Sequence, residues 1–146
     1  MGCKSQQAEE KKIMEQLPEP AFEQIATGNH AHYNFNGIHL ISNDESLKRW
    51  YLAIYGEFYL TDNDLPAIDW KNESIVFHML GTRTTGGFGS RGDKLTAQGN
   101  RVTFYLSETS PAAGEMVTMA ITHPYAIYKI NRPAGMVTIA PESVPR

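Results

Sequence analysis

Histidine is the residue type in this sequence best suited to metal binding or proton transfer. His30 and His32 are separated by one alanine, so an extended backbone would place both imidazole rings on one face. No carboxylate lies close to them in the sequence, and a metal site needs three or four ligands. We therefore expect exposed turn histidines, and we predict no metal site and no cofactor. His78, within an apolar segment, is expected to be a hydrogen-bonded core residue.

A glycine-rich stretch at residues 87–92 matches the G-x-G-x-x-G pattern of dinucleotide-binding sites. Such a site needs a helix that begins at the glycines, so that the N-terminus of the helix faces the pyrophosphate. Here the following residues favour a β-hairpin, so we expect a flexible or bulged loop between strands. The same loop contains Arg91, Gly92 and Asp93, the tripeptide that integrins recognise, which we interpret as a chance match.

The remaining motifs do not indicate catalysis. Residues 62–64 begin like a calcium loop but lack the glycine and the terminal glutamate at the required spacing, so a turn is expected. The sequence contains no G-x-S-x-G, H-E-x-x-H or P-loop pattern. We predict no catalytic residues and no enzymatic activity.

Size and composition are those of one ordinary globular domain. The chain has 146 residues, of which 41% are hydrophobic and 20% charged, with a net charge of -3. No cluster of Lys and Arg suggests a nucleic-acid partner, and no apolar run has the length of a membrane-spanning helix. A single cysteine rules out a disulfide within the chain, so the fold depends on its hydrophobic core.

That cysteine, Cys3, follows Gly2 and precedes a polar stretch, which resembles a bacterial lipoprotein after removal of its signal peptide. We predict lipid attachment at Cys3 and a location in the bacterial cell envelope. Lys4 in place of Asp favours the outer membrane or the periplasmic face. Two alternatives stay open. N-myristoylation expects Ser or Thr where Gln6 stands, and the third possibility is a free surface thiol.

Residues 1–20 are predicted to be a polar tether and residues 21–146 a single β-rich domain. Residues 22–27 and 35–41 read as two extended segments. One amphipathic helix follows, beginning at a capping box of Ser42 and Glu45 and ending at Gly56. The apolar face of this helix has the spacing i, i+3, i+4, i+7 and consists of Leu47, Trp50, Tyr51 and Ile54.

The second half of the chain has a β pattern throughout. Residues 75–80 are apolar on both faces, which predicts a central strand. Gly99 and Asn100 indicate a hairpin turn between residues 94–98 and 101–107. Further strands are predicted from the alternating apolar residues at 117–121, 126–130 and 137–139. The fold class is therefore α+β and mostly β: an antiparallel sandwich or half-barrel of seven to eight short strands with one main amphipathic helix.

Two motifs resemble one known family. Residues 81–88, Gly-Thr-Arg-Thr-Thr-Gly-Gly-Phe, are similar to the G-x-[KR]-x-T-G-G-aromatic signature of the PrcB C-terminal domain family. The second half of that signature also looks present, as Pro111 followed by residues 114–118 and by Thr-His-Pro-Tyr at 122–125. The resemblance covers residues 73–131. It departs from the family at Phe88, where tyrosine is common.

The namesake of that family is a lipoprotein that stabilises a cell-surface protease complex of the subtilisin type. The resemblance implies a non-catalytic module that binds or stabilises another envelope protein, for example a protease, and that reaches the membrane only through a lipid anchor. This agrees with the interpretation of Cys3. The alternatives are a small-ligand-binding or inhibitor-like domain and, less favoured, a hydrolase with a dispersed site.

The predicted partner-binding residues belong to the two motifs. Gly86 and Gly87 permit a positive φ angle or a close approach of two backbones, and Pro124 denies a hydrogen bond to a strand ladder and is a candidate for a cis bond. Both motifs can serve as kinks that shape the fold, or they can form an edge that takes a partner peptide by strand addition. The residues assigned to this function are Thr85, Gly86, Gly87, Phe88, His123, Pro124 and Tyr125.

Overall fold

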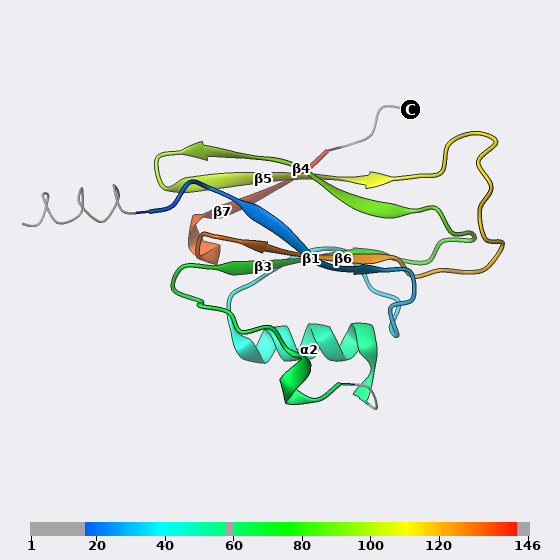
Figure 1. Ribbon diagram of the computed structural model, residues 1–146, viewed down its shortest axis with the longest axis horizontal. Coiled ribbons are helices and arrows are strands. Elements are labelled where there is room, and N and C mark those ends of the chain that lie inside the picture. The colour runs from blue at the N-terminus through cyan, green and yellow to red at the C-terminus, as the bar shows by residue number, and fades with distance from the viewer. Residues whose placement is uncertain (1–16, 58–59, 143–146) are drawn as a thin grey trace, which may run out of the picture.

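The computed structural model describes residues 17–57 and 60–142, and Cys3 and most of the predicted tether lie outside them. The described chain forms seven strands, one α-helix and two 3-10 turns (Figure 1). Their bounds in chain order are β1 Phe22–Gly28, β2 Asn36–Ile41, α2 Asp44–Tyr55, η2 Asp62–Asp64, β3 Ser74–Leu80, β4 Gly89–Gln98, β5 Arg101–Thr109, β6 Tyr125–Ile130, η3 Ala134–Met136 and β7 Val137–Glu142.

Four strands form an antiparallel sheet in the order β1-β6-β3-β2. Strand β3 is buried along its whole length, which confirms the central strand predicted from its apolar residues on both faces. Its side chains alternate between two cores, as the pleat of a strand requires. Phe77 faces helix α2, whereas Val76 faces the second sheet.

The second sheet has the order β4-β5-β7. Strands β4 and β5 form the predicted hairpin around Gly99 and Asn100, and the ladder has an irregularity between Gly92 and Lys94. Strand β7 pairs with β5 in parallel, so the second sheet is mixed rather than antiparallel throughout. The mostly-β sandwich with one helix is otherwise confirmed.

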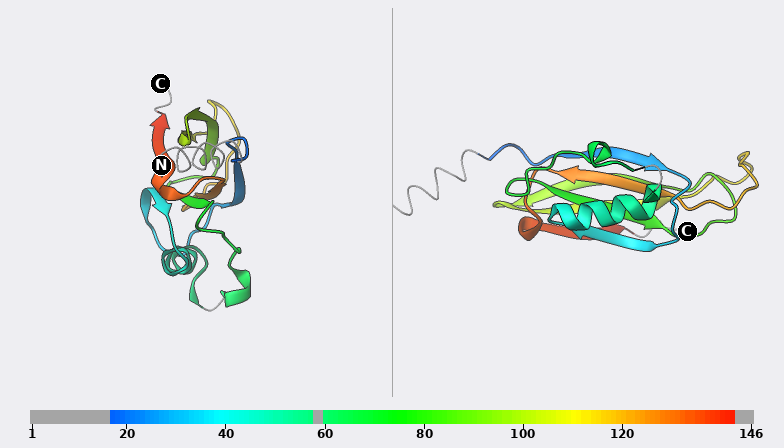
Figure 2. Two further views of the ribbon diagram at one scale, coloured as in Figure 1. Left: turned by 90° about the vertical axis from the view of Figure 1, so that its left-hand side faces the viewer. Right: turned by 90° about the horizontal axis from the view of Figure 1, so that it is seen from below.

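The molecule has three layers: the mixed sheet, the four-stranded sheet and helix α2. Figure 2 shows α2 lying lengthwise across the outer face of the four-stranded sheet. Tyr51 and Ile54 of the predicted apolar face are buried against that sheet, and Phe104 of β5 fills the space between the sheets. The four-stranded sheet therefore lies between two hydrophobic cores, one beneath α2 and one against the second sheet.

The start of α2 differs from the prediction by one residue. Asn43, not Ser42, is the N-cap residue, and its side-chain oxygen accepts a hydrogen bond of 2.8 Å from the amide of Ser46. Asn and Ser are comparable N-cap residues, so the tertiary position of the chain decides between them. Gly56 ends the helix at φ 79°, as predicted.

The described chain begins with a short extended segment fastened to the end of β6. The Asn131 side chain donates to the carbonyl of Glu19 at 2.7 Å and accepts from the amide of Ala21 at 2.8 Å. The guanidinium of Arg132, which is 3% exposed, donates to the carbonyl of Pro18 at 2.7 Å. Residues 18–21 are thus held against the domain by these two side chains.

Candidate functional site

The two predicted motifs lie in two segments that project together from one end of the sandwich (Figure 1). The first segment, residues 81–88, connects β3 to β4, and the second, residues 110–124, connects β5 to β6. We call these two segments the arm. Arg83 and Thr122 exchange two backbone hydrogen bonds of 2.9 Å, and Gly86 donates to the carbonyl of Thr118 at 2.8 Å. The arm is therefore one hydrogen-bonded unit, although its halves are far apart in the sequence.

Gly87 lies close to the second segment of the arm. It has φ +90°, a region that other L-residues rarely adopt. A Cβ atom at this position would lie 3.0 Å from Pro111 Cβ and 3.0 Å from Val117 Cγ1. Gly87 therefore has both features that were predicted to require glycine, a positive φ angle and a close approach of two segments. Gly86 is buried but has no positive φ angle.

Phe88 is half-buried and lies beneath a cation. The Arg83 guanidinium carbon is 5.4 Å from the centre of the Phe88 ring, within the range of a cation–π contact. Arg83 also forms an ion pair with Glu108 at the end of β5, and its Nε donates to Glu108 Oε1 at 3.0 Å. Arg83 was predicted only as part of the family signature, yet it joins Phe88 to the β5 strand.

Large apolar side chains are exposed on the second segment of the arm. Met116, Met119 and Ile121 are 97%, 84% and 65% exposed. The strand predicted at residues 117–121 is not formed, because this segment projects beyond both sheets and pairs only with the first segment of the arm. The alternating pattern that suggested a strand therefore places apolar side chains in solvent.

The second motif forms the base of the arm. The amide of His123 donates to the carbonyl of Asn29 at 2.7 Å, and the carbonyl of Pro124 accepts from the amide of Leu80 at 3.0 Å. Peptide bonds of the described chain are all trans, so Pro124 is not in the cis form. Tyr125 is 8% exposed, and its hydroxyl donates to the Tyr55 hydroxyl at 3.2 Å. Its ring packs in the core beside Tyr55.

A polar chain crosses the two sheets next to the arm. His78 Nδ1 and Ser90 Oγ are 2.6 Å apart, and Ser90 Oγ and the Tyr128 hydroxyl are 2.7 Å apart. His78 is 8% exposed, which confirms the predicted hydrogen-bonded core histidine.

Burial lowers the pKa of His78. The nearby carboxylate of Glu108 raises this pKa, and the guanidinium of Arg83 lowers it further. Burial also raises the pKa of Tyr128. Ser90 was not predicted from the sequence, because nothing in the residues around it indicates its contact with a histidine of the other sheet.

The other sequence motifs have structural explanations. Gly92 lies within β4, where a Cβ atom would be 2.5 Å from Phe22 Cε2, so this glycine makes room for an aromatic ring. Residues 89–92 belong to strand β4 rather than to the expected loop, and no helix begins at residues 87–92. Arg91 Nε donates to Asp93 Oδ1 at 2.6 Å within the same strand.

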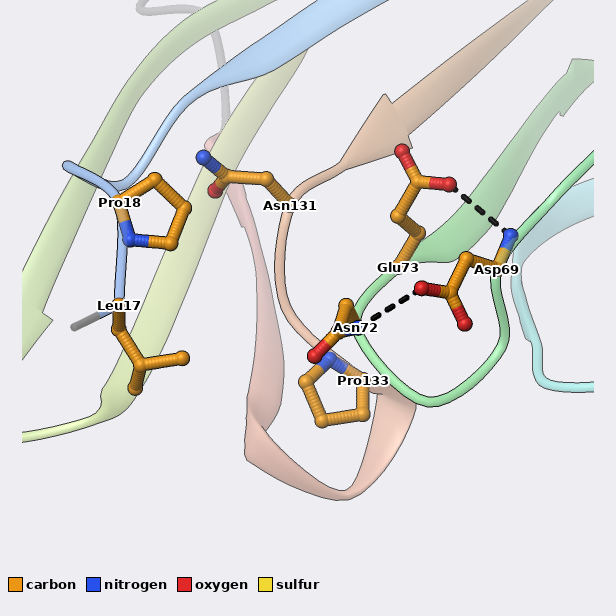
Figure 3. A pocket seen from close by; sticks show the side chains of 7 residues that line it. All are labelled: Leu17, Pro18, Asp69, Asn72, Glu73, Asn131 and Pro133. Carbon is orange, nitrogen blue, oxygen red and sulfur yellow. Dashed lines mark hydrogen bonds between the residues drawn. The ribbon is translucent and has the colours of Figure 1, made fainter. Parts of the chain in front are cut away.

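Two hollows of the described chain are open to solvent and are lined by residues outside the arm. One hollow, of about 380 Å³, is formed where residues 17–18 meet the loop before β3 and the end of β6 (Figure 3). Its acidic groups already have partners: Glu73 accepts from the amide of Asp69 at 3.0 Å and pairs with Lys129 at 3.5 Å. A smaller hollow of about 260 Å³ lies beside Phe35 and Trp50.

Within residues 17–57 and 60–142, no three His, Cys, Asp or Glu side chains gather closely enough to hold a metal ion. In the same part of the chain, no helix has both the length and the apolar character that a membrane crossing requires.

These features define a mostly-β, three-layer domain with a projecting two-segment arm. Residues 74–131 match the model of a protein family described as PrcB C-terminal, which is the family predicted from the two motifs. The match includes β3, the whole arm, the β4–β5 hairpin and β6, and leaves β1, β2, α2 and β7 outside. Searches of curated proteins and of solved structures gave no match.

Proposed function

We propose that this protein is a non-catalytic module of the bacterial cell envelope that uses its arm to hold another protein, for example a surface protease complex. The observation that supports this function most strongly is the exposure of Met116, Met119 and Ile121 on a segment fixed by hydrogen bonds. Large apolar side chains exposed on one segment are typical of an interaction site, and flexible methionine side chains adapt to a partner surface.

The match to the PrcB C-terminal family supports an accessory role, because it covers the arm together with the strands on which the arm rests. Each of the four strands β3, β4, β5 and β6 ends or begins at the arm. Two of them belong to each sheet, so the arm is anchored to both layers of the sandwich. Such an anchor allows a binding loop to keep its shape before a partner arrives, which lowers the entropic cost of binding.

The position of the arm also suits a tethered binding module. The described chain begins at the opposite end of the long axis from the arm (Figure 1). We also propose a lipid on Cys3. The membrane would then lie at the end where the described chain begins, and the arm would extend away from the membrane. The apolar side chains would then be presented to proteins outside the bilayer surface.

Affinity capture of the full-length tagged protein from gently solubilised native envelopes, followed by mass spectrometry, tests this function. We expect a stoichiometric partner that is lost when Met116, Met119 and Ile121 are changed together to Ser. The matched control changes Tyr33 and Phe35 to Ser. These residues are 55% and 47% exposed and contact α2, since the amide of Tyr33 donates to the carbonyl of Ala53 and the Phe35 ring meets that of Trp50. Loss of the partner in the control variant, or no partner at all, would refute the binding role of the arm.

A further inference from the structure

The hydrogen bond between His78 and Ser90 closes the first segment of the arm at its base. His78 lies two residues before the end of β3, and Ser90 is the second residue of β4. Their side chains meet at 2.6 Å, so residues 79–89 form a loop whose two ends are held together. Tyr128 of β6 holds the same serine hydroxyl at 2.7 Å. This contact adds to the backbone hydrogen bonds of Leu80 and His123 that hold the base of the arm.

Two charged groups face His78. Glu108 of β5 lies opposite Ser90 in the β4–β5 ladder and forms the ion pair with Arg83 of the arm. The strands on either side of His78 contribute uncharged partners, Ile38 from β2 and Ala126 from β6. A positive charge on His78 would therefore attract the carboxylate of Glu108, which is already paired with Arg83 of the arm.

We propose that His78 is a protonation switch for the arm: neutral His78 leaves Glu108 paired with Arg83, and protonated His78 draws Glu108 away from Arg83 and opens the arm. Arg83 then loses the carboxylate that fixes it above Phe88, and the first segment loses its link to β5. The consequence for partner binding rests on the proposed function, whereas the opening of the arm does not.

The direction of the effect follows from proton binding. Burial holds the pKa of His78 below its usual value of 6.5 in the closed arm. When the arm opens, water reaches the imidazole and its pKa returns toward the usual value, so the open state binds protons more readily. The closed arm is therefore favoured above about pH 6.5 and loses stability as the pH falls toward the lowered pKa, with at most about a tenfold change in the opening equilibrium per pH unit.

Amide hydrogen exchange of the full chain at pH 7.5 and pH 5.5, corrected for the intrinsic rates, measures this opening without any partner. We expect residues 81–90 and 116–124 to open at least about threefold more often at pH 5.5, while β3 and β6 stay protected. His78→Gln, which keeps hydrogen-bonding capacity but cannot be protonated, should remove the pH dependence. His39→Gln, which removes a histidine that stacks on Trp50, should keep it.

The same pH dependence in His78→Gln as in the wild type would overturn the switch. So would an NMR titration of wild-type His78 with a pKa at or above 6.5, a measurement that holds even if the variant does not fold. If the arm opens as expected but envelope capture finds no partner, the switch is correct and the proposed binding function is wrong.

Discussion

The hydroxyl of Thr122 donates a hydrogen bond of 2.9 Å to the carbonyl of Thr85, joining one motif of the sequence to the other across 37 positions. Thr122 is 3% exposed, so this bond is shielded from water. The two halves of the family signature are thus the two facing sides of one structural unit. Substitutions in either half should therefore disturb the other.

Gly87→Ala should destabilise the protein by about 1–3 kcal/mol, because it combines backbone strain with a close contact. Gly114→Ala is the matched control in the same arm: Gly114 has φ +81°, but a Cβ atom there would have nothing within 4 Å. Gly114→Ala should show the backbone cost alone, and chemical denaturation of both variants separates the two effects. Equal losses of unfolding free energy would mean that Pro111 and Val117 move aside without cost.

Gly92→Ala should destabilise the core by about 1–3 kcal/mol, since the new methyl group would overlap the ring of Phe22. The same substitution in a Phe22→Leu background should cost clearly less, because the smaller side chain leaves room. A double-mutant cycle from urea unfolding curves measures this coupling. A coupling energy of zero would show that the glycine is needed for another reason, such as the irregular register between Gly92 and Lys94.

Asn43→Ala should lower the unfolding free energy by about 1 kcal/mol, the usual loss for an N-cap side chain. Ser42→Ala is its neighbour and control, and we expect that substitution to be close to neutral. Thermal unfolding followed by circular dichroism distinguishes the two. A larger loss at Ser42 than at Asn43 would support the capping box predicted from the sequence over the cap seen in the structure.

Alkaline conditions should unfold the protein through buried tyrosines. Burial raises the pKa of Tyr51 from its usual value of 10.0 to about 12, and burial together with the Tyr55 hydroxyl raises that of Tyr125 further. A raised pKa in the folded state means that stability is complete below pH 10 and is lost as the pH rises toward the folded-state value. Tyr51→Phe should flatten the stability profile above pH 10, whereas Tyr33→Phe, at an exposed position, should not.

Much of the fold could be predicted because local patterns agree with the tertiary structure. The apolar residues on both faces of β3 require burial on both sides, and a Gly-Asn turn is compatible with few structures other than a hairpin. The helix was found for a similar reason, since Leu47, Tyr51 and Ile54 share the face that packs on the sheet. In these cases the short-range signal and the long-range packing favour the same conformation.

Other features depend on contacts between distant residues and leave no local pattern. The alternation at residues 117–121 is compatible with a strand, but a strand also needs a neighbour, and only the segment around Gly86 is close enough to pair. Likewise, Ser90 meets His78 only because β3 and β4 belong to different sheets that pack together. The parallel pairing of β7 with β5 follows from the path of the chain after β6, which no spacing of residues indicates.

The attachment of residues 18–21 to Asn131 and Arg132 has a mechanical consequence. Strands β1 and β6 lie side by side, β1 leading away from these residues and β6 leading from the arm back to them. A pull between Pro18 and the arm would run along both strands rather than across them. Their ladder of hydrogen bonds would then bear the load in shear, all bonds together, instead of opening one bond at a time.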